Sequence, residues 1–122
     1  MIRRILVIDD DAGVRETIKQ TLDDRGYEVI TATNGALGLA AFRRARPDLA
    51  ITDIVMPVME GLQTIREMRR ERPDLPIIAI SAGDRTARHD FLEIARQLGA
   101  WEVVVKPFDP GEFAAVVESC LA

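Results

Sequence analysis

The chain has one cysteine in 122 residues, so it cannot form an internal disulfide. A domain of this length can be held by its apolar core alone, and a single thiol suits the reducing cytoplasm, where we expect this protein to lie. Long apolar runs are also lacking, and only a short one separates Arg4 from the acidic Asp9. The sequence therefore predicts neither a signal peptide nor a membrane span.

Basic residues are outnumbered by acidic ones, 16 to 20, which gives a formal net charge of −4. The arginines that lie close together fall near expected helix ends, where cations complement the helix dipole: Arg43, Arg44, Arg46, Arg66, Arg69, Arg70 and Arg72. No basic stripe follows the pattern needed to track a phosphate backbone, so we expect no direct contact with nucleic acid. The one histidine, His89, lies on an expected helix surface and is assigned no role.

Short apolar runs alternate with amphipathic segments along the chain. The expected strands are Ile5–Ile8, Tyr27–Thr31, Leu49–Thr52, Pro76–Ile80 and Val103–Val105. Five segments with apolar residues at helical spacing follow them. Helix starts are expected at Asn34, after Gly61 and at Asp109-Pro110-Gly111-Glu112, and helix ends at Gly26, Pro47, Pro73 and Gly99. This alternation predicts an α/β fold, a doubly wound parallel sheet with helices on both faces. Residues 1–122 are expected to form one domain, with no second domain in this chain.

Asp53 stops the buried run Leu49–Thr52, and the turn signal Met56-Pro57 follows within four residues. Open parallel sheets bind their ligands at the carboxyl ends of the strands. A carboxylate in that place is a nucleophile, a metal ligand or a loop cap. The other strand ends favour the first two roles.

Polar side chains follow three further strands. Asp9 and Asp10 come after the first strand, Ser81 after the fourth and Lys106 after the fifth. Because parallel strands end at the same edge, these groups can meet in one crevice. Clustered carboxylates need a cation, and hard oxygen ligands suit Mg²⁺. A carboxylate beside Mg²⁺ can attack a phosphoryl group, whose oxygens the lysine and the hydroxyl can contact. Asp11 is interpreted as a helix cap.

The segments at the strand ends also resemble those of a known family, in the same order: Ile5–Asp11, Asp53–Gly61, Ile80–Ala82 and Val105–Phe108. On these residues the chain resembles the receiver domains of response regulators, including chemotaxis receivers, in two-component signalling. The resemblance covers essentially the whole chain. It implies a flavodoxin-like receiver fold with five helices and strand order 2-1-3-4-5.

The resemblance further implies that Asp53 accepts a phosphoryl group from a histidine kinase or phosphotransfer protein in a Mg²⁺-dependent reaction. Asp10 would bind Mg²⁺ directly, and Asp9 would act largely through water. Asp53 itself and the backbone carbonyl of Val55 would complete the metal site.

Ser81 would be the switch hydroxyl and Lys106 the lysine that contacts the phosphoryl group, with a cis Lys106-Pro107 peptide. Signalling would pass through a change of surface at the fourth helix, fifth strand and fifth helix. The chain would catalyse only its own phosphorylation and dephosphorylation, and would not be an enzyme with a small-molecule substrate. Its partner would be a downstream protein or an output domain, and it would be a monomer or weak homodimer.

The sequence departs from the family at three places. Val103 occupies the position, three residues before Lys106, where the family usually has a switch aromatic. The stretch Gly83–Thr86 makes the segment before Lys106 a few residues longer than usual. Trp101-Glu102 stands where receivers of winged-helix transcription factors usually carry two aspartates, which argues against their mode of dimerisation.

Two other classes of function stay open beside the receiver. The first is a receiver-fold protein-interaction module that is not phosphorylated, which Val103 and the altered loop motivate. The second is a phosphohydrolase with an aspartyl nucleophile, but such enzymes need a second aspartate where this chain has Val55. An FMN-binding flavodoxin is disfavoured, because no phosphate-binding loop rich in Ser, Thr and Gly follows the first strand.

Overall fold

The computed structural model describes residues 1–54, 58–81 and 88–122, and of residues 58–60 and 88–92 the backbone only. Strands and helices alternate, as predicted. The strands are β1 (Arg4–Ile8), β2 (Glu28–Ala32), β3 (Leu49–Asp53), β4 (Ile77–Ser81) and β5 (Glu102–Val105). The helices are α1 (Ala12–Asp23), α2 (Gly35–Ala45), α3 (Val58–Glu71), α4 (Arg88–Gln97) and α5 (Pro110–Leu121).

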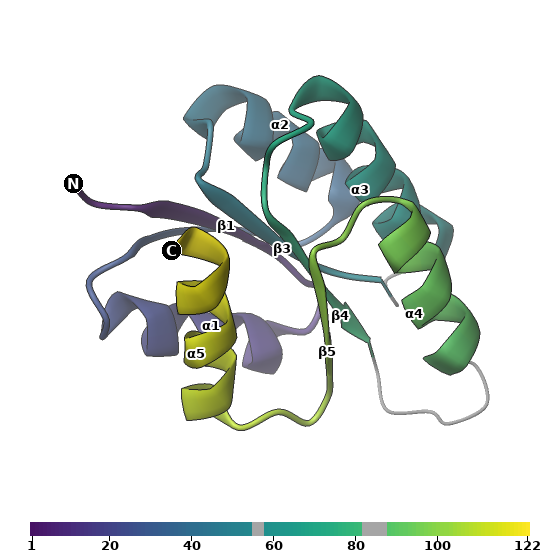
Figure 1. The fold of residues 1–122 in the computed structure, drawn as a ribbon. Coiled ribbons are helices and arrows are strands. Elements are labelled where there is room, and N and C mark those ends of the chain that lie inside the picture. The colour runs from purple at the N-terminus through teal and green to yellow at the C-terminus, as the bar shows by residue number, and fades with distance from the viewer. Residues whose placement is uncertain (55–57, 82–87) are drawn as a thin grey trace.

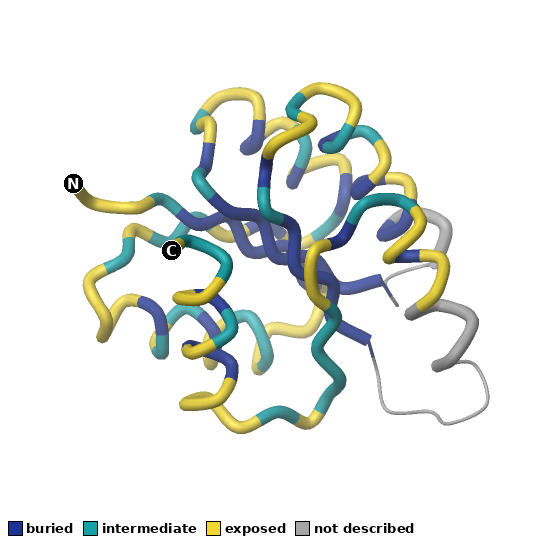
Figure 2. The backbone as a smooth tube through the Cα atoms, in the orientation of Figure 1, coloured by how far each residue is buried: buried dark blue, intermediate teal, exposed yellow. Residues whose placement is uncertain are grey.

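The five strands form one parallel sheet in the order β2-β1-β3-β4-β5, which confirms the predicted topology. Helices α1 and α5 cover one face, while α2, α3 and α4 cover the other (Figure 1). The central strands β1, β3 and β4 lie buried between these two layers, whereas the edge strands β2 and β5 are partly exposed (Figure 2). All strands therefore end at one edge, where the predicted polar residues gather.

Alternation along the strands divides the core into two clusters. In β1, Ile5 and Val7 join the cluster under α1 and α5, whereas Leu6 and Ile8 join the one under α2, α3 and α4. All four side chains are at most 1% exposed. Successive strand residues face opposite sides of a sheet, so a strand covered on both faces has to be apolar throughout.

Side-chain caps begin three helices where the sequence places them. Asp11 accepts hydrogen bonds from the backbone N–H groups of Gly13 and Val14 at the start of α1. Asn34 caps α2, and Asp109 caps α5, with Pro110 as the first helical residue. Each cap satisfies N–H groups that have no partner within the helix.

Helix α3 begins at Val58, and Gly61 lies within it rather than before it. A Cβ atom at this position would lie 2.6 Å from the carbonyl oxygen of Asp53 and 2.6 Å from the Cα of Ile54. The glycine is therefore needed for a close approach of two backbone segments, not for a turn, and the prediction of the helix start was wrong. The predicted loop change at Gly83–Thr86 lies outside the described residues.

Within the part of the chain that the structure describes, no helix has the length and apolarity needed to cross a membrane.

Candidate functional site

The carboxyl edge of the sheet brings three carboxylates together. Asp9 and Asp10 follow β1, and Asp53 is the last residue of β3. One ligand oxygen from each of these three residues lies within 4.8 Å of the others. Asp9 and Asp53 are 0% and 3% exposed, while Asp10 is exposed. The structure thus gathers the acidic residues that the sequence predicted as a metal-binding set.

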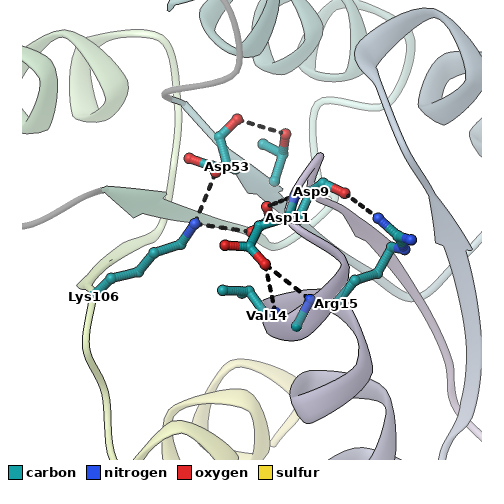
Figure 3. A network of polar contacts seen from close by, with 8 residues as sticks. Asp9, Asp11, Val14, Arg15, Asp53 and Lys106 are labelled. Atoms are coloured by element: carbon teal, nitrogen blue, oxygen red, sulfur yellow. Dashed lines mark hydrogen bonds and ion pairs between the residues drawn. The ribbon is translucent and has the colours of Figure 1, made fainter.

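Lys106 is the cation that faces this acidic set. Its Nζ donates a hydrogen bond to Oδ2 of Asp53 at 2.9 Å and lies 3.2 Å from Oδ2 of Asp9 (Figure 3). Its side chain is only 18% exposed. Burial alone would lower the pKa of Lys106, but its hydrogen bond to Asp53 and the charges of Asp53 and Asp9 raise it. The lysine is therefore held as a cation between two carboxylates.

Lys106 is the first residue of the connection between β5 and α5. The Lys106-Pro107 peptide is cis, as predicted. The ring of Phe108 stacks on that of Phe113 in α5, with ring centroids 4.7 Å apart. Such aromatic contacts anchor a segment by apolar burial and ring geometry. The turn that carries the lysine is thereby attached to the core.

The carboxyl of Asp9 has a raised pKa. Burial raises the pKa of its carboxyl to about 6, the charge of Asp53 adds to this, and a backbone hydrogen bond from Asp11 and the charge of Lys106 oppose it. Its Oδ1 accepts that bond, Asp11 N–H to Oδ1, at 2.9 Å. Its Oδ2 is buried and accepts no hydrogen bond from any residue that the structure describes.

A buried carboxylate oxygen without a hydrogen bond, beside two further carboxylates, fits a hard divalent cation. Mg²⁺ prefers oxygen ligands, and its charge would favour the ionised form of all three acids. The residues Asp9, Asp10 and Asp53 can therefore hold such an ion. Val55, whose carbonyl the sequence analysis added to this set, lies outside the described residues.

Ser81 ends β4 at the same edge and is 1% exposed. Its backbone carbonyl accepts a hydrogen bond from the N–H of Lys106 at 2.8 Å. Ser81 pairs with Val105 in the β4–β5 register, while Asp53 pairs with Ile80. Ser81 therefore lies on β4, between β3, which ends at Asp53, and β5, which is followed by Lys106.

Val103 is a partly buried residue of β5, paired with Ala79. Its side chain packs against the core cluster under α2, α3 and α4. The position that the family usually fills with a switch aromatic is therefore a small apolar contact in this chain.

One contact at the site was not foreseen from the sequence. The guanidinium of Arg15, from the first turns of α1, donates a hydrogen bond to the backbone carbonyl of Asp9 at 2.9 Å (Figure 3). A basic residue near a helix N-terminus runs against the helix dipole, and that conflict was the signal available in the sequence.

Comparisons with known proteins agree with this geometry. The family model described as "Response regulator receiver domain" matches residues 5–118. The probable transcriptional regulator ycf27 of Pyropia yezoensis is 43% identical over 97% of this chain, and response regulator MprA of Mycobacterium leprae is 35% identical over 97%. The match covers 47% and 50% of those two proteins, so the chain spans about half the length of these curated relatives.

Solved structures give the same result for the fold. The chemotaxis response regulator CheY4 of Vibrio cholerae superposes with a TM-score of 0.88 at 30% identity, over 99% of this chain and 100% of that one. NtrX from Brucella abortus gives 0.89 at 30% identity, over 99% of this chain and 27% of its own. The chain belongs to the response-regulator receiver domain family of two-component signalling systems.

Proposed function

We propose that Asp53 accepts a phosphoryl group from a phosphohistidine on a histidine kinase or phosphotransfer protein. The observation that carries this proposal is the placement of the Lys106 ammonium 2.9 Å from the Asp53 carboxylate, beside two further acids. A buried carboxylate with a fixed cation at one oxygen is prepared to receive a group whose oxygens carry negative charge.

In the proposed transfer, a carboxylate oxygen of Asp53 attacks phosphorus. The bond between phosphorus and the donor's imidazole nitrogen breaks, and the imidazole leaves and takes up a proton. Lys106 then exchanges its contact with the carboxylate for one with a phosphoryl oxygen, and the hydroxyl of Ser81 donates to another. Hydrolysis of the acyl phosphate by water returns Asp53 to a carboxylate.

Asp9, Asp10 and Asp53 hold Mg²⁺ in this proposal, with the carbonyl of Val55. When bound, the ion supplies positive charge that offsets the repulsion between carboxylates and phosphoryl oxygens. The buried Oδ2 of Asp9, whose contact is the ion pair with Lys106 rather than a hydrogen bond, supports this assignment. Asp10 is exposed, so its carboxylate can bind the ion without first losing contact with water.

Response regulators are signalling proteins rather than enzymes with small-molecule substrates. We infer that this chain acts in the cytoplasm as a single receiver domain, as a monomer or weak homodimer. Its phosphorylation changes the surface formed by α4, β5 and α5. The probable transcriptional regulator ycf27 of Pyropia yezoensis is about twice as long as the part that matches this chain, which supports an output domain or downstream protein as the receiver of the signal.

Val103 favours a second candidate function, an interaction module of receiver fold that is not phosphorylated. Without a switch aromatic, one usual route from the hydroxyl to the α4–β5–α5 surface is missing. The complete set of acids and the buried Lys106 favour the phosphorylated receiver over this alternative.

Chemical trapping tests the proposal and separates the two candidates. The protein is incubated with acetyl phosphate and Mg²⁺ and then reduced with borohydride, which converts an acyl phosphate to an alcohol. Peptide mass spectrometry should find the reduced residue at position 53, and none when EDTA replaces Mg²⁺. A folded protein that binds Mg²⁺ but gives no reduced residue would favour the interaction module.

A further inference from the structure

The carbonyl group of Asp9 lies just beyond the last rung of the sheet. Asp9 N–H donates to the carbonyl of Ala32, and the pairing of β1 with β3 ends one residue earlier, at Ile8 and Thr52. The carbonyl of Asp9 faces the same neighbour as its N–H, and it lies beyond Ala32, the last residue of β2, so this strand supplies no donor to it. Arg15 supplies one instead, with its NH1 at 2.9 Å in a partly buried contact.

The same arginine is tied to the β1–α1 turn through its backbone. The N–H of Arg15 donates to the carbonyl of Asp11 at 3.0 Å. The side chain of Asp11 caps α1 through Gly13 and Val14, and its N–H donates to Oδ1 of Asp9. These hydrogen bonds connect the end of β1 to the first turn of α1 at two points, through Asp11 and through Arg15 (Figure 3).

Arg15 is half-buried and sits where the helix dipole disfavours a cation. Its contact among the described residues is with a peptide carbonyl and not with a carboxylate oxygen. Lys106 is the side chain that pairs with the acids. The guanidinium is thus placed to fix a peptide group rather than to neutralise the site.

We propose that Arg15 is a positioning residue for the metal site, which acts by holding the peptide that joins Asp9 to Asp10. One plane carries the carbonyl of Asp9 and the N–H of Asp10, so fixing it sets the directions in which both side chains leave the turn. Asp9 points inward and is buried, and Asp10 remains exposed. This inference rests on the proposed function in that it takes these acids as the Mg²⁺ ligands.

Isothermal titration with MgCl₂, without any phosphodonor, tests the role. Arg15→Met keeps an apolar stem but removes the donors, and Arg25→Met is the matched control for net charge, because Arg25 lies on the exposed turn after α1. Substitution of a residue that orients metal ligands typically lowers the affinity for the metal 10–100-fold. We expect about a 10-fold higher Kd for Arg15→Met and a change below twofold for Arg25→Met.

A second readout is independent of the metal. In EDTA, the backbone ¹⁵N resonance of Asp10, which shares its peptide with the Asp9 carbonyl, should shift in Arg15→Met and stay in place in Arg25→Met. A merely structural role would lower the melting temperature of the metal-free protein without moving either this resonance or the Kd for Mg²⁺.

Arg15→Lys keeps the charge and covers the case in which Arg15→Met does not fold. Its Kd should exceed that of the wild type at least twofold, because an ammonium cannot reproduce the guanidinium contact. A wild-type Kd in this variant would assign the effect to charge alone and overturn the positioning role. So would an unchanged Kd in a folded Arg15→Met.

The two proposals fail separately. Wild-type protein that binds Mg²⁺ but is never phosphorylated would overturn the proposed function, and the comparison of Kd values would still decide the role of Arg15. If the protein is phosphorylated but Arg15→Met has the same Kd for Mg²⁺ as the wild type, only the positioning role would be overturned.

Discussion

Lys106 and Asp53, 53 positions apart in sequence, meet with 2.9 Å between Nζ and Oδ2, at the ends of two strands that are not adjacent in the sheet. The same ammonium lies 3.2 Å from the buried Oδ2 of Asp9. Among the described residues, Lys106 is thus the cation that pairs with carboxylates of this three-acid cluster. That arrangement leads to most of the predictions below.

The acid of Asp9 makes the stability of the metal-free protein depend on pH. Burial raises its pKa to about 6, above the ordinary value of 3.8, so the folded state holds the proton more tightly than the unfolded state. Its contribution to the free energy of unfolding is full below pH ~4 and is lost as the pH rises through about 6, a change on the order of 3 kcal/mol.

Urea denaturation in EDTA from pH 4 to 8, for wild type and Asp9→Asn, measures this contribution, because the amide cannot titrate. The stability of the wild type relative to the variant should fall across that range. Added Mg²⁺ should stabilise the wild type increasingly above pH 6, where the acid is ionised. If, in EDTA, the stability of the wild type relative to Asp9→Asn instead rose with pH, the pKa of Asp9 would be lowered in the folded state rather than raised.

Lys106→Met should destabilise the metal-free protein at neutral pH. Two nearly buried carboxylates lose the cation between them, and breaking such a contact from one side costs about 1–3 kcal/mol when the lysine is partly exposed. Mg²⁺ should recover much of the loss. Lys19→Met is the matched control, because Lys19 pairs with Asp23 in an exposed i,i+4 contact worth at most about 0.5 kcal/mol.

The measurement is urea denaturation with EDTA and with Mg²⁺, alongside labelling by acetyl phosphate. We expect the lysine variant to be labelled slowly and to show a reduced change at the α4–β5–α5 surface by NMR. Equal destabilisation by the Lys106 and Lys19 substitutions would refute the role given to the buried ion pair.

Asp10→Ala and Asp11→Ala should separate metal binding from helix capping. Asp10 is an exposed acid of the cluster, so its loss should weaken Mg²⁺ affinity most while leaving metal-free stability equal or higher. Asp11 caps α1, so its loss should cost about 1 kcal/mol of stability. Calorimetric Mg²⁺ titration and thermal unfolding in EDTA measure the two effects, and a reversed pattern would exchange the two assignments.

Gly61→Ala should destabilise the protein by about 1–3 kcal/mol, the usual cost of overpacking. The new Cβ would lie 2.6 Å from backbone atoms of Asp53 and Ile54, which cannot rotate away. Gly111→Ala is the control, because its Cβ would meet only the Asp109 carboxylate, at 3.1 Å. Thermal unfolding should show the loss in the first variant alone. A neutral Gly61→Ala would mean that α3 does not pack this closely on the end of β3.

The fold was predictable because its central strands are buried on both faces and its helices carry strong end signals. A continuous apolar run, such as those around Ile5 and Ile51, predicts a buried strand. The Asp109-Pro110 pair predicts the start of a helix, and α5 begins there. The strand order came from the family resemblance. The start of α3 was misplaced because a glycine can serve either a turn or a close approach, and only the backbone of Asp53 and Ile54 tells which.

The candidate site was predictable residue by residue wherever a polar group ends a strand, as Asp53 and Ser81 do, or directly follows one, as Asp9 and Lys106 do. The raised pKa of Asp9 was not predictable, because it depends on burial, and Asp9 and Asp10 are alike in sequence but opposite in exposure. The contact of Arg15 was missed because its partner is a backbone carbonyl, which no sequence pattern identifies; the sequence showed only that this cation lies near a helix N-terminus.

The most direct test of the central claim is the intact mass of wild type and Asp53→Asn after parallel incubation with acetyl phosphate and Mg²⁺. The account predicts a gain of one phosphoryl group in the wild type and none in the variant, with both proteins folded by circular dichroism. Equal labelling of the two would contradict the assignment of Asp53 as the acceptor. No labelling of either would contradict the receiver chemistry itself.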